Sequence, residues 1–82
     1  MADRRLVAIL LTERLGDILA SEPVAREARR RWPNALIVWF CNGRFEPVVR
    51  CFPAVDEVFP VVCLTEIILL QRSLSNWTII DL

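Results

Sequence analysis

The sequence predicts an α/β fold in which helices flank a Rossmann-like parallel sheet. Apolar runs typical of buried strands alternate along the chain with stretches whose apolar residues recur at helical spacing. Most changes between the two patterns coincide with Gly, Pro, Asn or Asp, which favour turns and helix ends. Strands that alternate with helices form βαβ units, and such units build a parallel sheet with right-handed crossovers.

The first strand is predicted over residues 5–11, where apolar residues follow one another as in a central parallel strand. A helix is predicted over residues 18–32, with Asp17 as its N-cap. Pro23 lies inside this helical pattern, so we expect a kink or a delayed start of the regular helix. The apolar residues expected to face the sheet recur every four positions: Ala20, Val24, Ala28 and Trp32.

The rest of the chain continues the alternation of strands and helices. Asn42 and Gly43 predict a turn, and Pro60 predicts that the strand containing it is interrupted or lies at an edge of the sheet. The predicted elements are a strand over residues 35–41, a short helix over 45–52, a strand over 57–62, a helix over 65–74 and a strand over 77–82.

Length and composition indicate one small domain or part of one. The chain has 82 residues, and a domain of such a size buries only about 60% of its unfolded surface. Hydrophobic residues make up 55% of the chain, which is more apolar surface than a solvated unit of this length would cover. We therefore expect part of this surface to pack against further chain, and residues 79–82 to be a strand that lacks its following helix.

The charge balance excludes some classes of partner. Ten arginines balance ten acidic residues, so the chain lacks the basic excess expected of a nucleic-acid-binding protein. In the first predicted helix, i,i+4 spacing pairs Glu22 with Arg26 and Glu27 with Arg31. A solvated helix face explains the arginine cluster there, and contact with anionic lipids or an acidic acceptor is the alternative. The cluster comprises Arg26, Arg29, Arg30 and Arg31.

The cysteines and the apolar runs bear on location. Cys41, Cys51 and Cys63 are widely spaced, and the chain has no CxxC and no His, so neither a disulfide framework nor a zinc site is predicted. Free thiols favour a reducing compartment. No signal peptide is recognisable, and the apolar runs are far shorter than the roughly 18–20 residues of a membrane span. We expect a cytoplasmic protein.

The carboxyl ends of the strands are where ligands of open α/β sheets bind. Asp17 follows the first strand, and Asp81 ends the last. The only glycines are Gly16 and Gly43, so neither GxGxxG nor a Walker A loop is present, which disfavours dinucleotide-binding dehydrogenases and P-loop NTPases. Gly16, at the first strand-to-helix turn, still permits close backbone approach by a ligand. Spacing alone favours a helix cap as the explanation of Asp17 over a catalytic role.

Four stretches follow one another along the chain: LLTERLGDILASEPVAREARRRWPNALIVWF, GRFEPVV, FPAVDEVFPV and TIIDL. In this order they resemble the opening of a family 9 glycosyltransferase, the family of the bacterial heptosyltransferases of lipopolysaccharide core synthesis. The resemblance covers nearly the whole chain but only the first segment of those longer enzymes. It implies the N-terminal, acceptor-side part of a GT-B glycosyltransferase, without the C-terminal donor-binding domain.

The resemblance also implies a catalytic residue. Gly16-Asp17 matches the Gly-Asp of the family's first turn, whose carboxylate is thought to act as general base. In the implied inverting reaction, this carboxylate deprotonates the acceptor hydroxyl, which attacks the anomeric carbon while the diphosphate leaves from the opposite face. The implied leaving-group stabilisers are side chains and helix ends, without a divalent metal.

Further substrate contacts follow from the same resemblance. Relatives often carry a small hydroxyl residue before the Leu-Gly-Asp or Met-Gly-Asp, and Thr12 would take this role one or two positions early. A turn explains the residues after the second strand as well as an acceptor-side loop does, and Asp81 matches a recurrent strand end. The implied substrate-binding residues are Thr12, Glu13, Arg14, Gly16, Asn42, Gly43 and Arg44.

The implied co-substrate is a nucleotide-diphospho-sugar, which the missing domain would mainly bind, and no other cofactor is implied. The acceptor would be a saccharide or glycolipid like the lipopolysaccharide core, reached from the cytoplasm or at the inner membrane's cytoplasmic face. These 82 residues are not expected to catalyse transfer alone, because the cleft needs both walls.

Two other classes of protein remain open. A non-enzymatic α/β interaction module, or a truncated remnant, would self-associate or bind a partner through the open edge of its sheet. A flavodoxin-like or receiver-like domain is the second, although receivers need several acidic residues near the first strand end, and only Glu13 and Asp17 lie there. The tryptophans are interpreted as core residues rather than sugar-stacking platforms: Trp32, Trp39 and Trp77.

Overall fold

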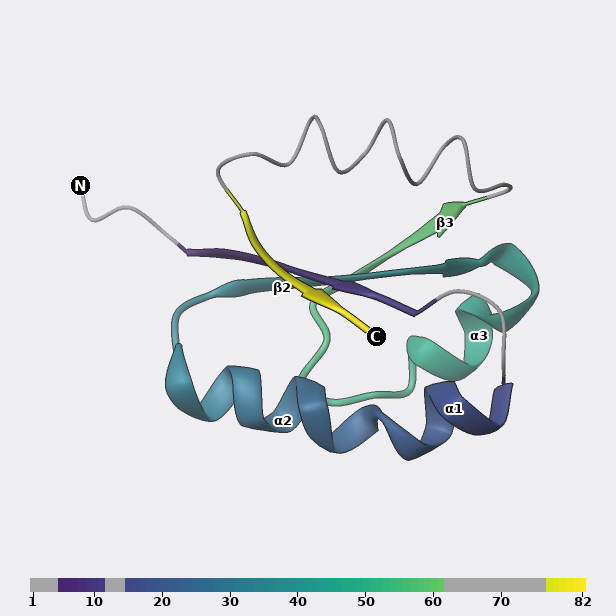
Figure 1. Ribbon diagram of the computed structural model, residues 1–82, viewed down its shortest axis with the longest axis horizontal. Helices are drawn as coiled ribbons and strands as arrows, with labels where there is room; N and C mark the ends of the chain where they lie inside the picture. The colour runs from purple at the N-terminus through teal and green to yellow at the C-terminus, as the bar shows by residue number, and fades with distance from the viewer. Residues whose placement is uncertain (1–4, 12–14, 62–76) are drawn as a thin grey trace.

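The computed structural model describes residues 5–11, 15–61 and 77–82. Its centre is a four-stranded parallel sheet with the strand order β3-β2-β1-β4 (Figure 1). The expected parallel α/β arrangement is confirmed, and each strand lies within one residue of its predicted bounds. The predicted helix over 65–74 falls outside the described residues. The strands are β1 (Leu6–Leu10), β2 (Leu36–Asn42), β3 (Glu57–Val61) and β4 (Thr78–Asp81).

The strand order distinguishes between the α/β classes that the sequence left open. β1 lies between β2 and β4, and β2 separates β1 from β3. A flavodoxin-like sheet places its third strand directly beside its first, whereas the order 3-2-1-4 begins a Rossmann-type doubly wound sheet. The flavodoxin-like and receiver-like alternative is therefore wrong. Pro60 does not interrupt β3, and of its two predicted effects the edge position holds, since β3 is at one end of the described strands.

One face of the sheet is covered by helices (Figure 1). These are α1 (Leu15–Ala20), α2 (Glu22–Arg31), the short 3₁₀ helix η1 (Gly43–Phe45) and α3 (Glu46–Val49). Side chains from the sheet and from the helices meet in one buried cluster, which we call the helix-side core. It includes Val7, Ile9, Ile18, Ala25, Ala28, Ile37, Trp39, Cys41, Val49, Phe52 and Val58.

The helix predicted over residues 18–32 is two helices that meet at Ser21. Pro23 has no N–H to donate to the Leu19 carbonyl, and its ring crowds that carbonyl, so α1 cannot continue through it. The chain turns instead at Ser21, whose N–H donates to the carbonyl oxygens of Asp17 (3.0 Å) and Ile18 (3.2 Å). The effect predicted for Pro23 is confirmed, and it takes the form of a complete break.

The break also changes which residues face the sheet. Ala28 is buried as predicted, but Ala20 is exposed. Because α1 and α2 are separate helices, a single four-residue repeat cannot run through both. Ile18 of α1 and Ala25 of α2 are the fully buried residues instead. Trp39 is a core residue, as interpreted from the sequence. Trp32 is half-buried against the helix-side core, and Trp77 is half-buried against a second cluster formed by Ala8, Leu10, Val38, Phe40 and Val61.

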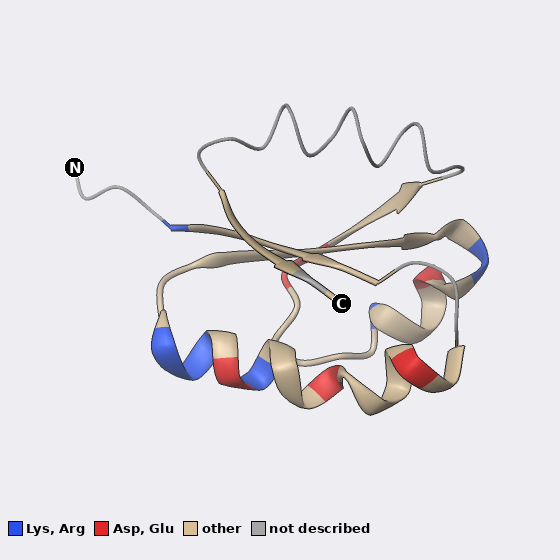
Figure 2. Cartoon of the chain, viewed as in Figure 1, with Lys and Arg blue, Asp and Glu red and all other residues tan. Residues whose placement is uncertain are grey.

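The arginines of α2 do not all lie on a solvated face. Residues of both charges occur along α1 and α2 (Figure 2), and Arg26 pairs with Glu22 as predicted. Glu27, however, pairs with Arg30 rather than Arg31. Arg31 lies over the Trp32 ring, with 5.7 Å between its guanidinium carbon and the ring centroid.

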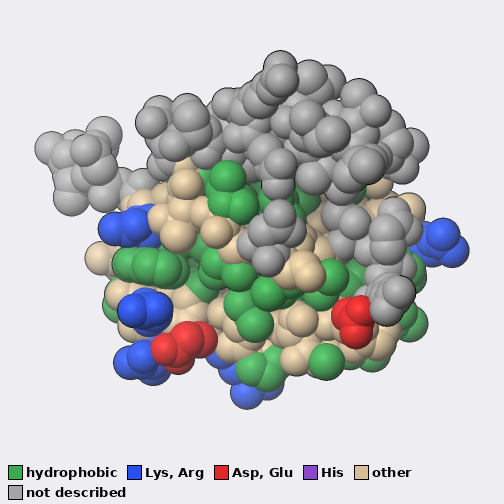
Figure 3. All heavy atoms as spheres, in the orientation of Figure 1, with side chains coloured by type: hydrophobic (Ala, Val, Ile, Leu, Met, Phe, Trp, Pro, Cys, Tyr) green, Lys and Arg blue, Asp and Glu red, His purple; other side chains and the backbone are tan. Residues whose placement is uncertain are grey.

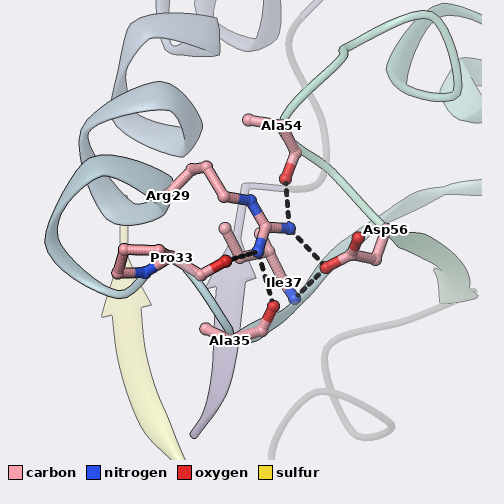
Figure 4. A network of polar contacts seen from close by, with 6 residues as sticks. All are labelled: Arg29, Pro33, Ala35, Ile37, Ala54 and Asp56. Atoms are coloured by element: carbon pink, nitrogen blue, oxygen red, sulfur yellow. Dashed lines mark hydrogen bonds and ion pairs between the residues drawn. The ribbon is translucent and has the colours of Figure 1, made fainter.

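Arg29 turns inward and joins three segments (Figure 4). Its guanidinium donates to the Ala35 carbonyl before β2 (2.7 Å) and the Ala54 carbonyl (3.2 Å). It also donates to Asp56 Oδ2 (2.6 Å), and the same oxygen accepts the Ile37 N–H (2.8 Å). This cluster ties the end of α2 to the starts of β2 and β3. We call it the Arg29 clamp, and it also includes the Pro33 carbonyl.

Cys41 supplies a prediction about pH. Burial, with a smaller contribution from Glu46, raises the pKa of the Cys41 thiol to about 11. The folded chain therefore keeps this proton at pH values where the unfolded chain has lost it, so stability should fall as pH rises from about 9 toward 11. The chain has no Lys and no Tyr to obscure this titration.

The measurement is chemical denaturation at pH 8 and pH 10.5 of the wild type, Cys41→Ala and Cys51→Ala. Cys51 is exposed, so Cys51→Ala should keep the loss of stability at high pH and Cys41→Ala should reduce it. Equal losses in all three proteins would contradict the role given to Cys41.

Candidate functional site

The candidate site lies at the carboxyl ends of the parallel strands. The end of β1 is flanked on both sides: Leu10 pairs with Phe40 of β2 and with Asp81 of β4. The first three strands proceed away from β4, and the chain then returns to place β4 on the other side of β1. The strand order thus reverses at β1, and in open α/β sheets ligands bind at the carboxyl ends beside such a switch point.

Asp17 is the third residue of α1, the helix that follows β1. The prediction that it is the N-cap is wrong, because the helix begins two residues earlier at Leu15. Its backbone is held at two points: its carbonyl accepts the Ser21 N–H, and the next residue, Ile18, is fully buried in the helix-side core. The Asp17 residue is exposed, so a well-anchored helical turn presents a carboxylate to solvent.

Gly16 lies in the first turn of α1, not in a tight turn before the helix. The described glycines have negative φ, so the backbone conformation does not require glycine here. Among the described residues, a Cβ added at Gly16 would meet no heavy atom within 4 Å. The described fold therefore gives no reason for a glycine at this position.

The loop after β2 lies at the same edge of the sheet. Asn42 ends β2, and its Oδ1 accepts the Arg44 N–H (3.1 Å), which caps η1. Gly43 and Arg44 are exposed, and the Arg44 guanidinium carbon lies 5.4 Å from the centre of the Phe45 ring. Asn42 thus has a structural role that needs no ligand, as the turn interpretation predicts. Arg44 is an exposed cation beside it, at the carboxyl end of β2.

The structure gathers only part of the predicted site. Asp17, Gly16 and the loop from Asn42 to Arg44 follow neighbouring parallel strands and share one edge. Asp81 ends β4 on the other side of β1, where its backbone pairs with Leu10. The predictions for Thr12, Glu13 and Arg14 fall outside the described residues.

One contact at this edge was not predicted from the sequence. Trp39 is fully buried, and its indole N–H donates to the carbonyl of Leu11, the residue directly after β1 (3.2 Å). The Leu11 N–H donates to the Phe40 carbonyl (3.4 Å). A buried indole N–H requires an acceptor, but the sequence does not say which, because Leu11 and Trp39 lie far apart along the chain.

The described residues contain neither a cluster of metal ligands nor a helix suited to cross a membrane. Within residues 5–11, 15–61 and 77–82, no group of three or more His, Cys, Asp or Glu side chains is placed to hold a metal ion. None of the helices in this part of the chain has the length and hydropathy needed to cross a membrane.

Comparison with known proteins found no family model, no curated protein and no solved structure that matches the chain. The arrangement of residues at the carboxyl ends of the strands is therefore the basis for a functional assignment. An exposed carboxylate on an anchored helical turn, beside a strand switch point, can accept a proton from a bound hydroxyl group.

Proposed function

We propose that this chain is the acceptor-side, N-terminal part of an inverting GT-B glycosyltransferase, with Asp17 as the general base. The sugar transferred would be a heptose or a related sugar from a nucleotide-diphospho-sugar. The acceptor would be a lipopolysaccharide-core-like saccharide or glycolipid, met in the cytoplasm or at the cytoplasmic face of the inner membrane. A second domain would bind most of the donor and supply the other wall of the cleft.

The observation that carries this proposal is the position of Asp17. It follows β1, the strand at which the sheet order reverses, and it is exposed on the first turn of α1. This is the position at which open α/β sheets bind ligands. The Leu15-Gly16-Asp17 sequence, which resembles the glycosyltransferase motif, therefore follows the strand beside which open α/β sheets commonly bind ligands, and this agreement supports the proposal.

The proposed reaction needs little from this part of the enzyme beyond a base and a place for the acceptor. The Asp17 carboxylate takes the proton of the acceptor hydroxyl as its oxygen attacks the anomeric carbon. The bond from that carbon to the nucleoside diphosphate breaks on the opposite face, and the diphosphate leaves with the electron pair. The Arg44 cation at the same edge would attract an acceptor that carries phosphate or carboxylate groups.

Gly16→Ala separates this proposal from a purely structural explanation. Alanine favours helix more than glycine does, and the added Cβ meets none of the described residues, so the folded chain should gain about 0.5 kcal/mol. If the acceptor lies over Asp17, the added methyl group should lower kcat/KM for transfer at least tenfold. Urea denaturation and a transfer assay measure the two effects. A more stable variant with unchanged turnover would contradict an acceptor site at Gly16.

A second candidate function has its own observation. β4 is an edge strand, and Ile79 and Leu82 are 38% and 51% exposed. Hydrophobic side chains are spread over the side of the molecule on which β4 lies (Figure 3). Such an edge suits pairing with another strand, as expected of an interaction module. This alternative predicts association that Asp17→Asn does not change and that a charge introduced by Ile79→Lys abolishes, as measured by analytical ultracentrifugation.

A further inference from the structure

We propose that Trp39 is a positioning residue for the general base, because it holds the end of β1 within the same core that holds the α1 turn carrying Asp17. Its indole N–H holds the Leu11 carbonyl, the last described group before the connection to α1. This inference rests on the proposed function in one respect only, which is the role of Asp17 as the base. The geometric part, that Trp39 holds the end of β1, stands by itself.

The bond lies beyond the regular pairing of the two strands. The register between β1 and β2 ends at Leu10 opposite Phe40. Leu11, the next residue, is bonded to β2 twice: its N–H donates to the Phe40 carbonyl, and its carbonyl accepts from the Trp39 indole. The side-chain bond therefore extends the attachment of β1 by one residue, toward the segment that carries Asp17.

The indole itself has little freedom to move. Trp39 is fully buried, and its ring meets Phe52 edge-to-face, with 5.3 Å between ring centroids and 67° between planes. Ile18, directly after Asp17, belongs to the same helix-side core. The Trp39 indole N–H thus holds the end of β1, and Ile18 holds the α1 turn that carries Asp17 in the same core. A general base requires such a fixed position, because small displacements reduce proton transfer strongly.

The test removes the N–H while it keeps the shape of the ring. Trp39 is replaced by β-(3-benzothienyl)alanine, in which sulfur takes the place of the indole N–H, and Trp39→Phe serves as a second variant. Native-state amide exchange is then followed by NMR at Leu11 and at Ser21, whose N–H bonds the Asp17 carbonyl. Loss of one hydrogen bond should accelerate exchange at these amides about three- to tenfold.

Val7→Ala is the matched control, because Val7 is buried in the same core at the opposite end of β1. It should accelerate exchange across the sheet in proportion to global stability. A local effect at Leu11 and Ser21 in both Trp39 variants supports the proposal. Equal acceleration at all amides, or none at these two, overturns it, since Trp39 would then be a packing residue only.

The two proposals fail in different ways. In a transfer assay, the Trp39 variants should lower kcat with little change in the KM for the donor. If Asp17→Asn transfers sugar normally, the proposed function fails, whatever the exchange data show. If Asp17→Asn is inactive but the Trp39 variants keep full kcat, the function stands and the positioning role of Trp39 is refuted.

Discussion

Asp17→Asn in the complete transferase is expected to lower kcat by about 10²–10⁴-fold, the usual contribution of a positioned general base. The amide has nearly the same shape as the carboxyl group but cannot accept the hydroxyl proton. Folding should remain nearly intact, because Asp17 is exposed and a charge in the first turn of a helix contributes only about 0.3–1 kcal/mol. Initial rates and denaturation midpoints measure the two effects.

Glu22→Gln is the matched control for this substitution. Glu22 is also an acidic residue in the first turn of a helix, since it begins α2, and it lies outside the candidate site. We expect this variant to transfer sugar at the wild-type rate with a similar small change in stability. Near-normal turnover in Asp17→Asn would refute the assignment of the base, and equal losses in both variants would indicate a general effect of charge.

Arg29→Ala is expected to destabilise the fold by about 2 kcal/mol, a large fraction of the stability of a small domain. The substitution removes four hydrogen-bonded contacts and leaves the carbonyls of Ala35 and Ala54 without their guanidinium donor. The clamp is part-buried, so its charges are less screened than those of surface pairs. Urea denaturation followed by circular dichroism measures the change.

Two variants make this test specific to the Arg29 clamp. Arg26→Ala breaks an exposed i,i+4 pair on the same helix and should cost less than about 0.5 kcal/mol. Arg29→Lys keeps the charge but loses the planar fork that reaches several acceptors, so it should be intermediate. If Arg29→Ala and Arg26→Ala have equal effects, the clamp does not hold the segments together.

Local pattern was sufficient to predict the strands, because each is a short, mostly apolar run, and for β2 the following Gly43 also marks its end. Local pattern did not predict that the first helix is divided into α1 and α2. Pro23 was expected to disturb the helix, but whether it bends or divides depends on the alternative bonds at Ser21. The helix also starts earlier than predicted, at Leu15, and it buries Ile18 in the helix-side core.

Contacts between distant segments could not be predicted at all. Arg29 and Asp56 meet only because the chain before β3 passes the end of α2, and the sequence showed Arg29 as one more exposed arginine. Trp39 and Leu11 meet because β1 and β2 are neighbours in register. The candidate site was located from Asp17 by sequence, whereas its place beside the switch point required the strand order.

The most direct test of the account is an NMR titration of the ¹⁵N-labelled chain with a phosphorylated heptose-containing core saccharide. The account predicts weak binding, with shift changes at Leu15–Ile18 and at Asn42–Arg44, the two segments that follow β1 and β2 at one edge. Gly16→Ala should weaken these changes. The absence of any change at saturating saccharide, or changes confined to β4 that grow with protein concentration, would contradict an acceptor site and favour an interaction module.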